Sequence, residues 1–320
     1  MPPNLRDTPY DRGSFSWLEN AYPLSSLKRD DGLLRELQRF QPHVTLIVGW
    51  EQPAYRRCAR QLRGSSLRVV CMDNQWLGTP KQFLGIASSR LYLRPYFDAA
   101  FLPGPRQMTF ALRLGFAKER IFEGFYSADV DAFRKIDPLS AAGVEARNAF
   151  VFIGRLAPGK GIPELVEAYE SYRTTVTDPW RLLIIGTGPL APLFDRVPGI
   201  ERAGFVEPAH MPAQLARASF LVLPSTFEPW GVAVHEATAA GLGCICTSTV
   251  GAADAFVRDG ANGRIVKPGS SAELAQALRW AHGRSAAQRA EVSRLSHLLA
   301  ERFSPERWAA TVIGMAESAT

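Results

Sequence analysis

A glycine-rich loop that leads into a helix carries two cations, in the segment GRLAPGKGIPELVEAYE at residues 154–170. The helix is predicted to begin at Pro163, and the free amides and dipole of a helix N-terminus favour an anion. Arg155 and Lys160 flank this loop, where fixed cations would stabilise the charge that develops on a leaving diphosphate. The alternative is that both side chains are solvated at the end of a strand, and the loop alone does not exclude it.

The same loop nearly satisfies the nucleotide-binding pattern G-x-x-x-x-G-K-[ST]. Gly154, Gly159 and Lys160 have the required spacing, but residue 161 is Gly instead of Ser or Thr. The hydroxyl that would hold magnesium is therefore missing. The later run FLVLPS also lacks the acidic residue that a nucleotide hydrolase places there. A nucleotide hydrolase is therefore not expected.

A second segment, STFEPWGVAVHEATAAG at residues 225–241, places two carboxylates around the start of a short helix. Glu228 lies in the loop and Glu236 lies eight positions later, so the two do not stack on one helix face. Carboxylates accept hydrogen bonds from vicinal hydroxyls, so one can reach a pyranose and the other a ribose. The amides of Gly231 and Val232 would face phosphate oxygens. The alternative for Glu236 is a buried cap or ion-pair partner.

Two short patterns resemble metal sites but are incomplete. His235 and Glu236 begin the zinc-protease pattern H-E-x-x-H, but residue 239 is Ala instead of a second His. Asp129 and Asp131 resemble a D-x-D metal clamp, yet they stand near the expected linker, where a turn or a cap between domains is the expected role. We therefore predict no metal site.

Composition and charge are those of an ordinary globular protein, with 46% hydrophobic and 21% charged residues. The four cysteines fit no zinc spacing and are expected to be reduced thiols in the core.

No apolar run reaches the ~18 residues of a membrane span, and the start, MPPNLRDTPYDRGSF, has no apolar stretch of a signal peptide, so a cytoplasmic protein is expected. The net charge is +6, but Lys and Arg are scattered, which favours phosphorylated small molecules or an anionic membrane surface over nucleic acid.

Short apolar runs alternate with amphipathic helical stretches in both halves of the chain, which predicts two domains of parallel βαβ units. The expected strands are 44–49, 67–72, 99–104 and 120–125 in the first half, and 149–154, 181–186, 220–224 and 243–247 in the second. The polar stretch 135–148 separates the two sets and is the expected linker. We therefore divide the chain into an N-terminal domain (1–138), a C-terminal domain (139–304) and a final helix (305–320).

Three helices are predicted at particular residues. A helix at residues 31–40 is expected to pack through one apolar face, formed by Leu33, Leu34, Leu37 and Phe40. The stretch PRQMTFALRLG is a helix that opens at Pro105 and closes at Gly115. The last helix begins near Pro305 and offers Trp308 and Ile313 for docking on another part of the chain.

The second half of the chain resembles glycosyltransferase family 4, a large group of retaining enzymes with the GT-B fold. The motifs that carry the resemblance are G-R-L-x-x-x-K-G at 154–161, IIGTGPL at 184–190, GFVEPAHMPAQLARASFLVLPSTFEPWG at 204–231, the E-x7-E pair Glu228 and Glu236, and GANGRIVKPG at 260–269. Five ordered motifs are specific, although each alone would be weak. The resemblance implies an α/β protein of GT-B type, with two Rossmann-like domains that face a cleft and an N-terminal acceptor domain that is shortened here.

The resemblance implies a role for each residue of these motifs. As catalytic residues, Arg155 and Lys160 would hold the diphosphate. Glu228, the third catalytic residue, would bind hydroxyls of the transferred sugar. The other donor-binding residues would be Glu236 at the ribose, Val206, Met211 and Leu215 at the base, Gly154 in the first motif, and the amides of Gly231 and Val232 at the phosphates.

The implied reaction is metal-independent, retaining transfer of a hexose from a nucleotide-diphosphate sugar to a polysaccharide, lipopolysaccharide or glycolipid. No cofactor is implied besides the nucleotide-sugar substrate. The resemblance is also compatible with peripheral contact at the inner face of a membrane.

The chain departs from the family pattern in three places. Asp254 stands in VGAADAF where the family has Glu, the first 30 residues contain no expected strand, and the turn MDNQW offers Asp73 where an acceptor-side His is usual. Two alternatives therefore stay open. One is an inactive nucleotide-sugar-binding homologue that supports a polysaccharide-assembly complex. The other is a nucleotide-sugar epimerase of the same fold, which is not expected to carry the E-x7-E pair.

Overall fold

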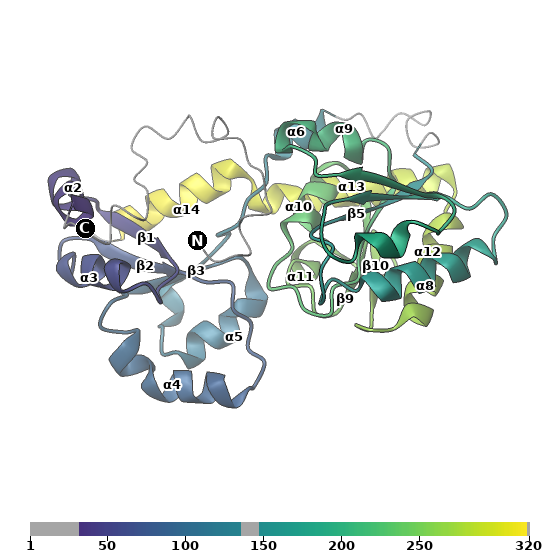
Figure 1. Ribbon diagram of the computed structural model, residues 1–320. Helices are drawn as coiled ribbons and strands as arrows, with labels where there is room; N and C mark the ends of the chain where they lie inside the picture. Colours follow the sequence, from purple (N-terminus) through teal and green to yellow (C-terminus); the bar gives the residue numbers. More distant parts are fainter. Residues whose placement is uncertain (1–31, 136–146, 319–320) are drawn as a thin grey trace.

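The computed structural model describes residues 32–135 and 147–318. These residues form two α/β domains that lie side by side, each built around one parallel sheet (Figure 1). The two-domain architecture predicted from the alternating apolar runs is confirmed. The first 30 residues and most of the expected linker, residues 136–146, lie outside the described residues.

The first domain is built on a sheet with the strand order β1-β2-β3-β4. Its strands are β1 (Val44–Val48), β2 (Leu67–Cys71), β3 (Ala99–Leu102) and β4 (Ile121–Glu123). The helices around it are α2 (Gly32–Phe40), α3 (Pro53–Gln61), α4 (Pro80–Tyr92) and α5 (Pro105–Arg113). The inner strands β2 and β3 are buried along their whole length, because both faces of a parallel sheet are covered.

The second domain is built on a larger sheet with the order β10-β9-β8-β5-β6-β7. Its strands are β5 (Ala149–Ile153), β6 (Arg181–Ile185), β7 (Ile200–Gly204), β8 (Phe220–Leu223), β9 (Gly243–Thr247) and β10 (Gly263–Val266). The helices around it are α8 (Ile162–Arg173), α9 (Met211–Leu215), α10 (Val232–Ala239), α11 (Ala253–Phe256), α12 (Ser271–His282) and α13 (Ala286–Ala300). The eight strands predicted from the sequence are all present.

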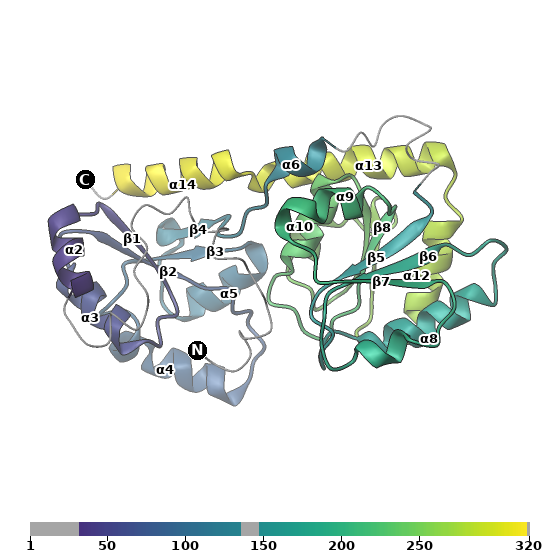
Figure 2. The same ribbon diagram turned by 45° about the horizontal axis from the view of Figure 1, so that its top comes forward.

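Two helices connect the domains. Helix α6 (Val130–Arg134) precedes the expected boundary at residue 138, yet its Val130 and Phe133 belong to the core of the second domain. Helix α14 (Pro305–Glu317) follows the second domain and extends along the first sheet (Figure 2). The Trp308 indole donates to the carbonyl of Phe125 at 3.1 Å, and Met315 is fully buried under the first sheet.

Two strands of the second sheet were missed from the sequence, and both lie at its edges. β7 (IERAG) carries Glu201 and Arg202, and β10 (GRIV) has only four residues, one of them Arg264. An edge strand has a neighbouring strand along one edge only and is therefore less enclosed, so it needs no continuous apolar run. The search for continuous apolar runs therefore missed these two strands, although it did find β1 and β4, the edge strands of the first sheet.

On two helices one residue of the predicted face is exposed, although Leu33, Leu34 and Leu37 of α2 are half-buried. Phe40 is 80% exposed instead of packed at the end of α2, and Ile313 is 60% exposed on α14. On α14 the docking contacts come from Trp308, Val312 and Met315, because residues at spacings of three and four share one helix face.

The four cysteines are free and buried, as predicted. Burial raises the pKa of Cys71 and of Cys246 to about 12, so neither thiol is an activated nucleophile near neutral pH.

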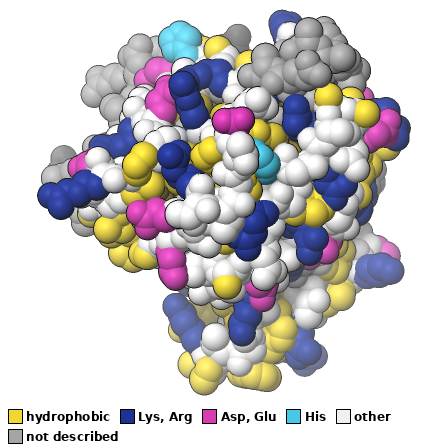
Figure 3. Space-filling view, turned by 90° about the vertical axis from the view of Figure 1, so that its right-hand side faces the viewer, with side chains coloured by type: hydrophobic (Ala, Val, Ile, Leu, Met, Phe, Trp, Pro, Cys, Tyr) yellow, Lys and Arg dark blue, Asp and Glu magenta, His cyan; other side chains and the backbone are white. Residues whose placement is uncertain are grey.

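On the face of the molecule shown in Figure 3, Lys and Arg are spread among acidic and apolar side chains. Within the described residues, no helix is long and apolar enough to span a membrane.

Candidate functional site

The loop 154–161 follows β5 and lies directly against the loop that follows β8. Gly161 has a φ of 66°, and a Cβ at this position would lie 2.1 Å from the carbonyl oxygen of Pro224, so a larger residue cannot fit without a shift of the backbone. The amide of Thr226 donates to the carbonyl of Gly159 at 2.9 Å. The glycines of the first motif therefore allow close contact with residues 224–231, which we call the Glu228 loop.

Lys160 and Glu228 come from these two loops and form an ion pair. The Nζ atom of Lys160 donates to Oε2 of Glu228, and Oγ of Ser225 donates to the same oxygen at 3.4 Å. The two charged side chains are 25% and 15% exposed, so both are shielded in part while still reaching solvent. Two of the three predicted catalytic residues are thus in direct contact.

Arg155, the third predicted catalytic residue, lies on the same loop and is exposed. Its guanidinium has no ion pair or hydrogen bond with the described residues, so its donors are available. Helix α8 begins directly after the loop, and no side chain caps its N-terminus at Gly161. The loop therefore presents a cation beside an uncapped helix start, which is the combination expected for an anion site.

Glu236 lies on α10 and is half-buried. Burial raises the pKa of its carboxyl to about 7. Within the described residues no hydrogen bond or ion pair reaches this carboxylate, so the alternative of a structural ion-pair partner finds no support there. A desolvated carboxylate without a partner is a good acceptor for ligand hydroxyls.

Helix α10 also begins without a side-chain cap. Gly231, its N-cap residue, has a φ of 97°. A Cβ on Gly231 would lie 3.2 Å from Glu228 and from Leu223, so glycine also gives the turn its space. The helix has the predicted form, from Val232 to a stop at Gly241, whose φ is 75°.

The three residues predicted for the base pocket differ in exposure. Val206 and Met211 are half-buried and pack against the core at its edge, whereas Leu215 is fully buried. Only Val206 and Met211 therefore present surface to a base. Leu215 belongs to the core against which these two side chains pack.

Asp73, the predicted acceptor-side residue, follows β2 in the first domain. The hydroxyl of Tyr126 donates to Oδ2 of Asp73 at 3.1 Å. The pKa of Tyr126 is raised, chiefly by burial and also by this carboxylate, so the phenol stays protonated and keeps donating. The hydroxyl of Tyr126 thus orients the carboxylate of Asp73.

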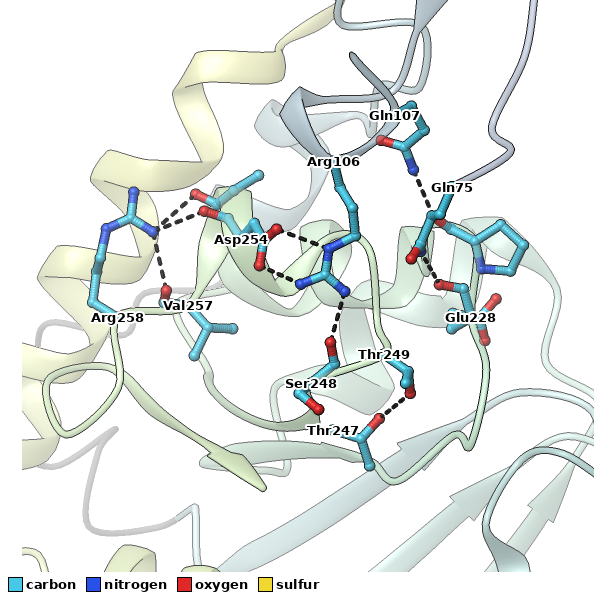
Figure 4. A network of polar contacts seen from close by, with 12 residues as sticks. Gln75, Arg106, Gln107, Glu228, Thr247, Ser248, Thr249, Asp254, Val257 and Arg258 are labelled. Atoms are coloured by element: carbon cyan, nitrogen blue, oxygen red, sulfur yellow. Dashed lines mark hydrogen bonds and ion pairs between the residues drawn. The ribbon is translucent and has the colours of Figure 1, made fainter. Parts of the chain in front are cut away.

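Two buried glutamines of the first domain contact the backbone of the Glu228 loop (Figure 4). The side-chain amide of Gln75 donates to the carbonyls of Glu228 and Pro229, each at 3.0 Å. The amide of Gln107, on α5, donates to the Pro229 carbonyl at 2.8 Å. The position of Glu228 therefore depends on side chains of the other domain.

A second contact between the domains lies beside the first. Nε and Nη2 of Arg106 donate to the two carboxylate oxygens of Asp254 at 2.8 and 2.5 Å, and Nη1 donates to the carbonyl of Ser248 at 2.7 Å (Figure 4). Two parallel bonds from one guanidinium fix the geometry as well as the charge. Asp254, the residue that departs from the family pattern, thus joins the two domains.

Trp230 fills the space between these contacts. Its side chain is 2% exposed, and a Cβ on Gly104 of the first domain would lie 2.7 Å from two of its ring atoms. None of Gln75, Arg106 and Gln107 was predicted as a site residue from the sequence. They stand in no motif, because their partners are in the other half of the chain.

One residue of each incomplete metal pattern has a structural role. Asp129 caps the N-terminus of α6, where its carboxylate accepts a hydrogen bond from the amide of Ala132 at 3.0 Å. The sequence had suggested a turn or a cap between domains. His235 is buried, stacks on Phe256, and has its pKa lowered to about 4 by burial. No group of three or more potential metal ligands occurs within the described residues.

Comparison with known proteins places the second domain in a known group. Residues 147–283 match the family described as Glycosyl transferases group 1. An alpha-D-kanosaminyltransferase of Streptomyces kanamyceticus is 25% identical over 161 residues, which cover 48% of this chain and 41% of that protein. An exopolysaccharide phosphotransferase of Streptomyces coelicolor is 31% identical over 284 residues, which cover 86% of this chain and 28% of that protein. The chain spans less than half the length of these relatives.

Solved structures match both domains. The crystal structure of Anabaena HepE in complex with UDP aligns with a TM-score of 0.68 and 18% identity, over 88% of this chain and 81% of that chain. The same protein has also been solved with UDP-glucose, and that structure aligns with a TM-score of 0.64 and 17% identity, over 93% of this chain and 82% of that chain.

Proposed function

We propose that this chain, which has the predicted GT-B fold and carries a glycosyl transferases group 1 domain at residues 147–283, transfers a sugar from a nucleoside-diphosphate sugar to an acceptor. The observation that carries the proposal is the contact between Lys160 and Glu228, with the exposed Arg155 on the same loop. One carboxylate and two cations at the carboxyl end of a parallel sheet suit a sugar joined to a diphosphate.

Each group has a distinct task in this proposal. Arg155 and Lys160 bind the diphosphate, with the uncapped starts of α8 and α10 facing further phosphate oxygens. Glu228 accepts hydrogen bonds from hydroxyls of the moving sugar. Glu236 accepts hydrogen bonds from the ribose, while Val206 and Met211 contact the base.

The reaction is proposed to retain the configuration of the sugar. The bond between the anomeric carbon and the diphosphate oxygen breaks, and the acceptor oxygen forms its new bond on the same face. The acceptor hydroxyl gives its proton to the leaving phosphate. The negative charge that grows on that phosphate is stabilised by Lys160 and Arg155, so the two cations act on the transition state more than on the bound donor.

No divalent metal is needed in this scheme, because fixed cations and helix amides take the part of the metal. UDP is the first nucleotide to test, since HepE has been solved with UDP and with UDP-glucose. The acceptor is proposed to be a glycan or glycolipid. The name of the Streptomyces coelicolor relative, an exopolysaccharide phosphotransferase, supports this choice.

The test is a thermal-shift screen with UDP-, GDP- and ADP-sugars, followed by a transfer assay with the donor that binds. A ligand at a hundred times its dissociation constant adds about 2.7 kcal/mol to the free energy of unfolding. Stabilisation by a donor together with its turnover supports an enzyme. Stabilisation without any turnover or hydrolysis would instead support the inactive, donor-binding homologue.

A further inference from the structure

A cavity of about 670 Å³ lies in the first domain, between the carboxyl ends of β1 and β2 and the helices α4 and α5. Apolar side chains form much of its wall: the buried Val70, Met72 and Leu93, together with Phe110 of α5 and Leu114 directly after that helix. A volume of this size is typical of small-molecule sites. None of the proposed donor contacts uses it.

The apolar lining continues to the protein surface along α4. Leu84 and Tyr92 both line the cavity, and they are 71% and 60% exposed. These two side chains extend the apolar surface of the cavity to solvent, and contiguous apolar surfaces of sufficient size mark binding sites. Polar side chains also line the cavity, among them Asn74, Lys81 and Ser88.

One end of the cavity is connected through the chain to the contact with the Glu228 loop. Asn74 lines the cavity, and the following residue, Gln75, donates to the backbone carbonyls of Glu228 and Pro229. A molecule with an apolar part in the cavity could therefore extend a polar end past Asn74 toward the Glu228 loop.

We propose that this cavity binds the apolar part of the acceptor, an alkyl or aromatic group attached to the sugar that is glycosylated. The hydroxyl that reacts lies at the Asn74 end, and the apolar group extends between α4 and α5 toward Leu84 and Tyr92. That the bound molecule is the acceptor rests on the proposed function. Binding of an apolar glycoside in the cavity does not depend on it.

Gly85 offers a variant that fills the cavity without disturbing the fold. It lies on α4 and lines the cavity, and a Cβ at this position meets no atom within 4 Å. Phe is also a better helix former than Gly, so Gly85→Phe is expected to fold. Gly314 on α14 is the matched control, because it too is helical and has no atom within 4 Å of an added Cβ, and it does not line the cavity.

The experiment measures binding of methyl, hexyl and octyl β-D-glucosides by calorimetry, below their micelle concentrations. Each methylene that enters the cavity should tighten binding about fourfold, which corresponds to about 0.8 kcal/mol. Gly85→Phe should weaken octyl glucoside at least tenfold and leave UDP binding unchanged. Gly314→Phe should bind all three glucosides as the parent does.

Three results would overturn the inference. The first is affinity that does not depend on chain length, and the second is equal octyl glucoside binding by the parent and Gly85→Phe. The third is an affinity that depends on alkyl length only after residues 1–31 of the protein are deleted. In that case the protein's own N-terminal segment would be the occupant of the cavity. Chain-length-dependent binding without sugar transfer from any donor supports the cavity site and counts against the proposed function alone.

Discussion

Lys160 and Glu228 are paired across two loops that follow neighbouring strands, β5 and β8, in the middle of the second sheet. An ammonium group has three donors, so Lys160 can hold Glu228 and still donate to a phosphate oxygen. The pair therefore orients both side chains before a donor arrives. Preorganised charges of this kind stabilise a transition state without a cost of rearrangement during the reaction.

Lys160→Ala is expected to lower kcat at least a hundredfold and to change the donor KM much less. The reason is that the charge opposite Lys160 grows as the phosphate leaves, and loss of one such donor costs about 3 to 4 kcal/mol. Steady-state kinetics with the donor found in the screen measures both constants. Lys118→Ala is the control, because Lys118 is exposed and lies in the first domain. A kcat equal to that of the parent would remove Lys160 from the mechanism.

Glu228→Gln and Glu236→Gln should have different effects on nucleotide binding. Glu228 is proposed to touch the sugar alone, so its variant should lose transfer and keep its affinity for UDP. Glu236 is proposed to hold the ribose, so its variant should bind UDP and the full donor roughly tenfold to a hundredfold more weakly, as expected for a charge-assisted hydrogen bond of about 1.5 to 3 kcal/mol. Calorimetry with UDP compares them. Equal weakening in both variants contradicts the assignment.

That Lys160 and Glu228 lie close together could be predicted from the sequence. The inner strands of a parallel sheet are covered on both faces, so β5 and β8 appear as short apolar runs followed by Gly or Pro. The carboxyl ends of parallel strands meet at one edge of the sheet, and Lys160 and Glu228 both follow such ends.

The contacts between the domains could not be predicted in this way. Gln75 and Glu228 are 153 residues apart, and Arg106 and Asp254 are 148 residues apart. Such pairs depend on how two separately folded sheets meet, and hydrophobic periodicity reports only the local packing of each element. The same limit explains Ile313, since the face that α14 presents is set by the sheet on which it packs.

Gln75→Leu tests whether the first domain holds the Glu228 loop in position. The variant keeps the volume nearly unchanged and removes the amide that donates to Glu228 and Pro229. Transfer should fall roughly thirtyfold, because two hydrogen bonds to partly buried carbonyls are lost at about 1 kcal/mol each, while affinity for UDP should stay within about twofold. Gln61→Leu, at an exposed position on α3, is the control. Unchanged transfer in Gln75→Leu would show that these contacts do not position Glu228.

Full activity is expected in excess EDTA. Arg155, Lys160 and the uncapped helix starts supply the positive charge that a metal would otherwise bring to the diphosphate. The measurement is the transfer rate before and after chelation, with manganese added back. Loss of activity that manganese restores would contradict the metal-independent scheme and return Asp129 and Asp131 to consideration as ligands.

The buried carboxyl of Glu236 should make the unliganded protein less stable as the pH rises. Its pKa in the folded state is about 7, above the ordinary value of 4.5, so the folded state holds the proton more tightly than the unfolded state does. This contribution to stability is fully present below about pH 4.5 and is lost as the pH rises through about 7. A difference of this size corresponds to at most about 3 kcal/mol.

Glu236→Gln stays uncharged at every pH, so it should gain stability relative to the parent between pH 5 and 8. Urea unfolding of both proteins at several pH values measures this difference, and calorimetry with UDP at the same values measures the ligand side. The parent's affinity for UDP should rise as Glu236 ionises and becomes a stronger acceptor for the ribose, and the variant's should not follow it. A variant that is less stable than the parent at all pH values, with unchanged UDP affinity, would assign Glu236 to the fold and not to the ligand.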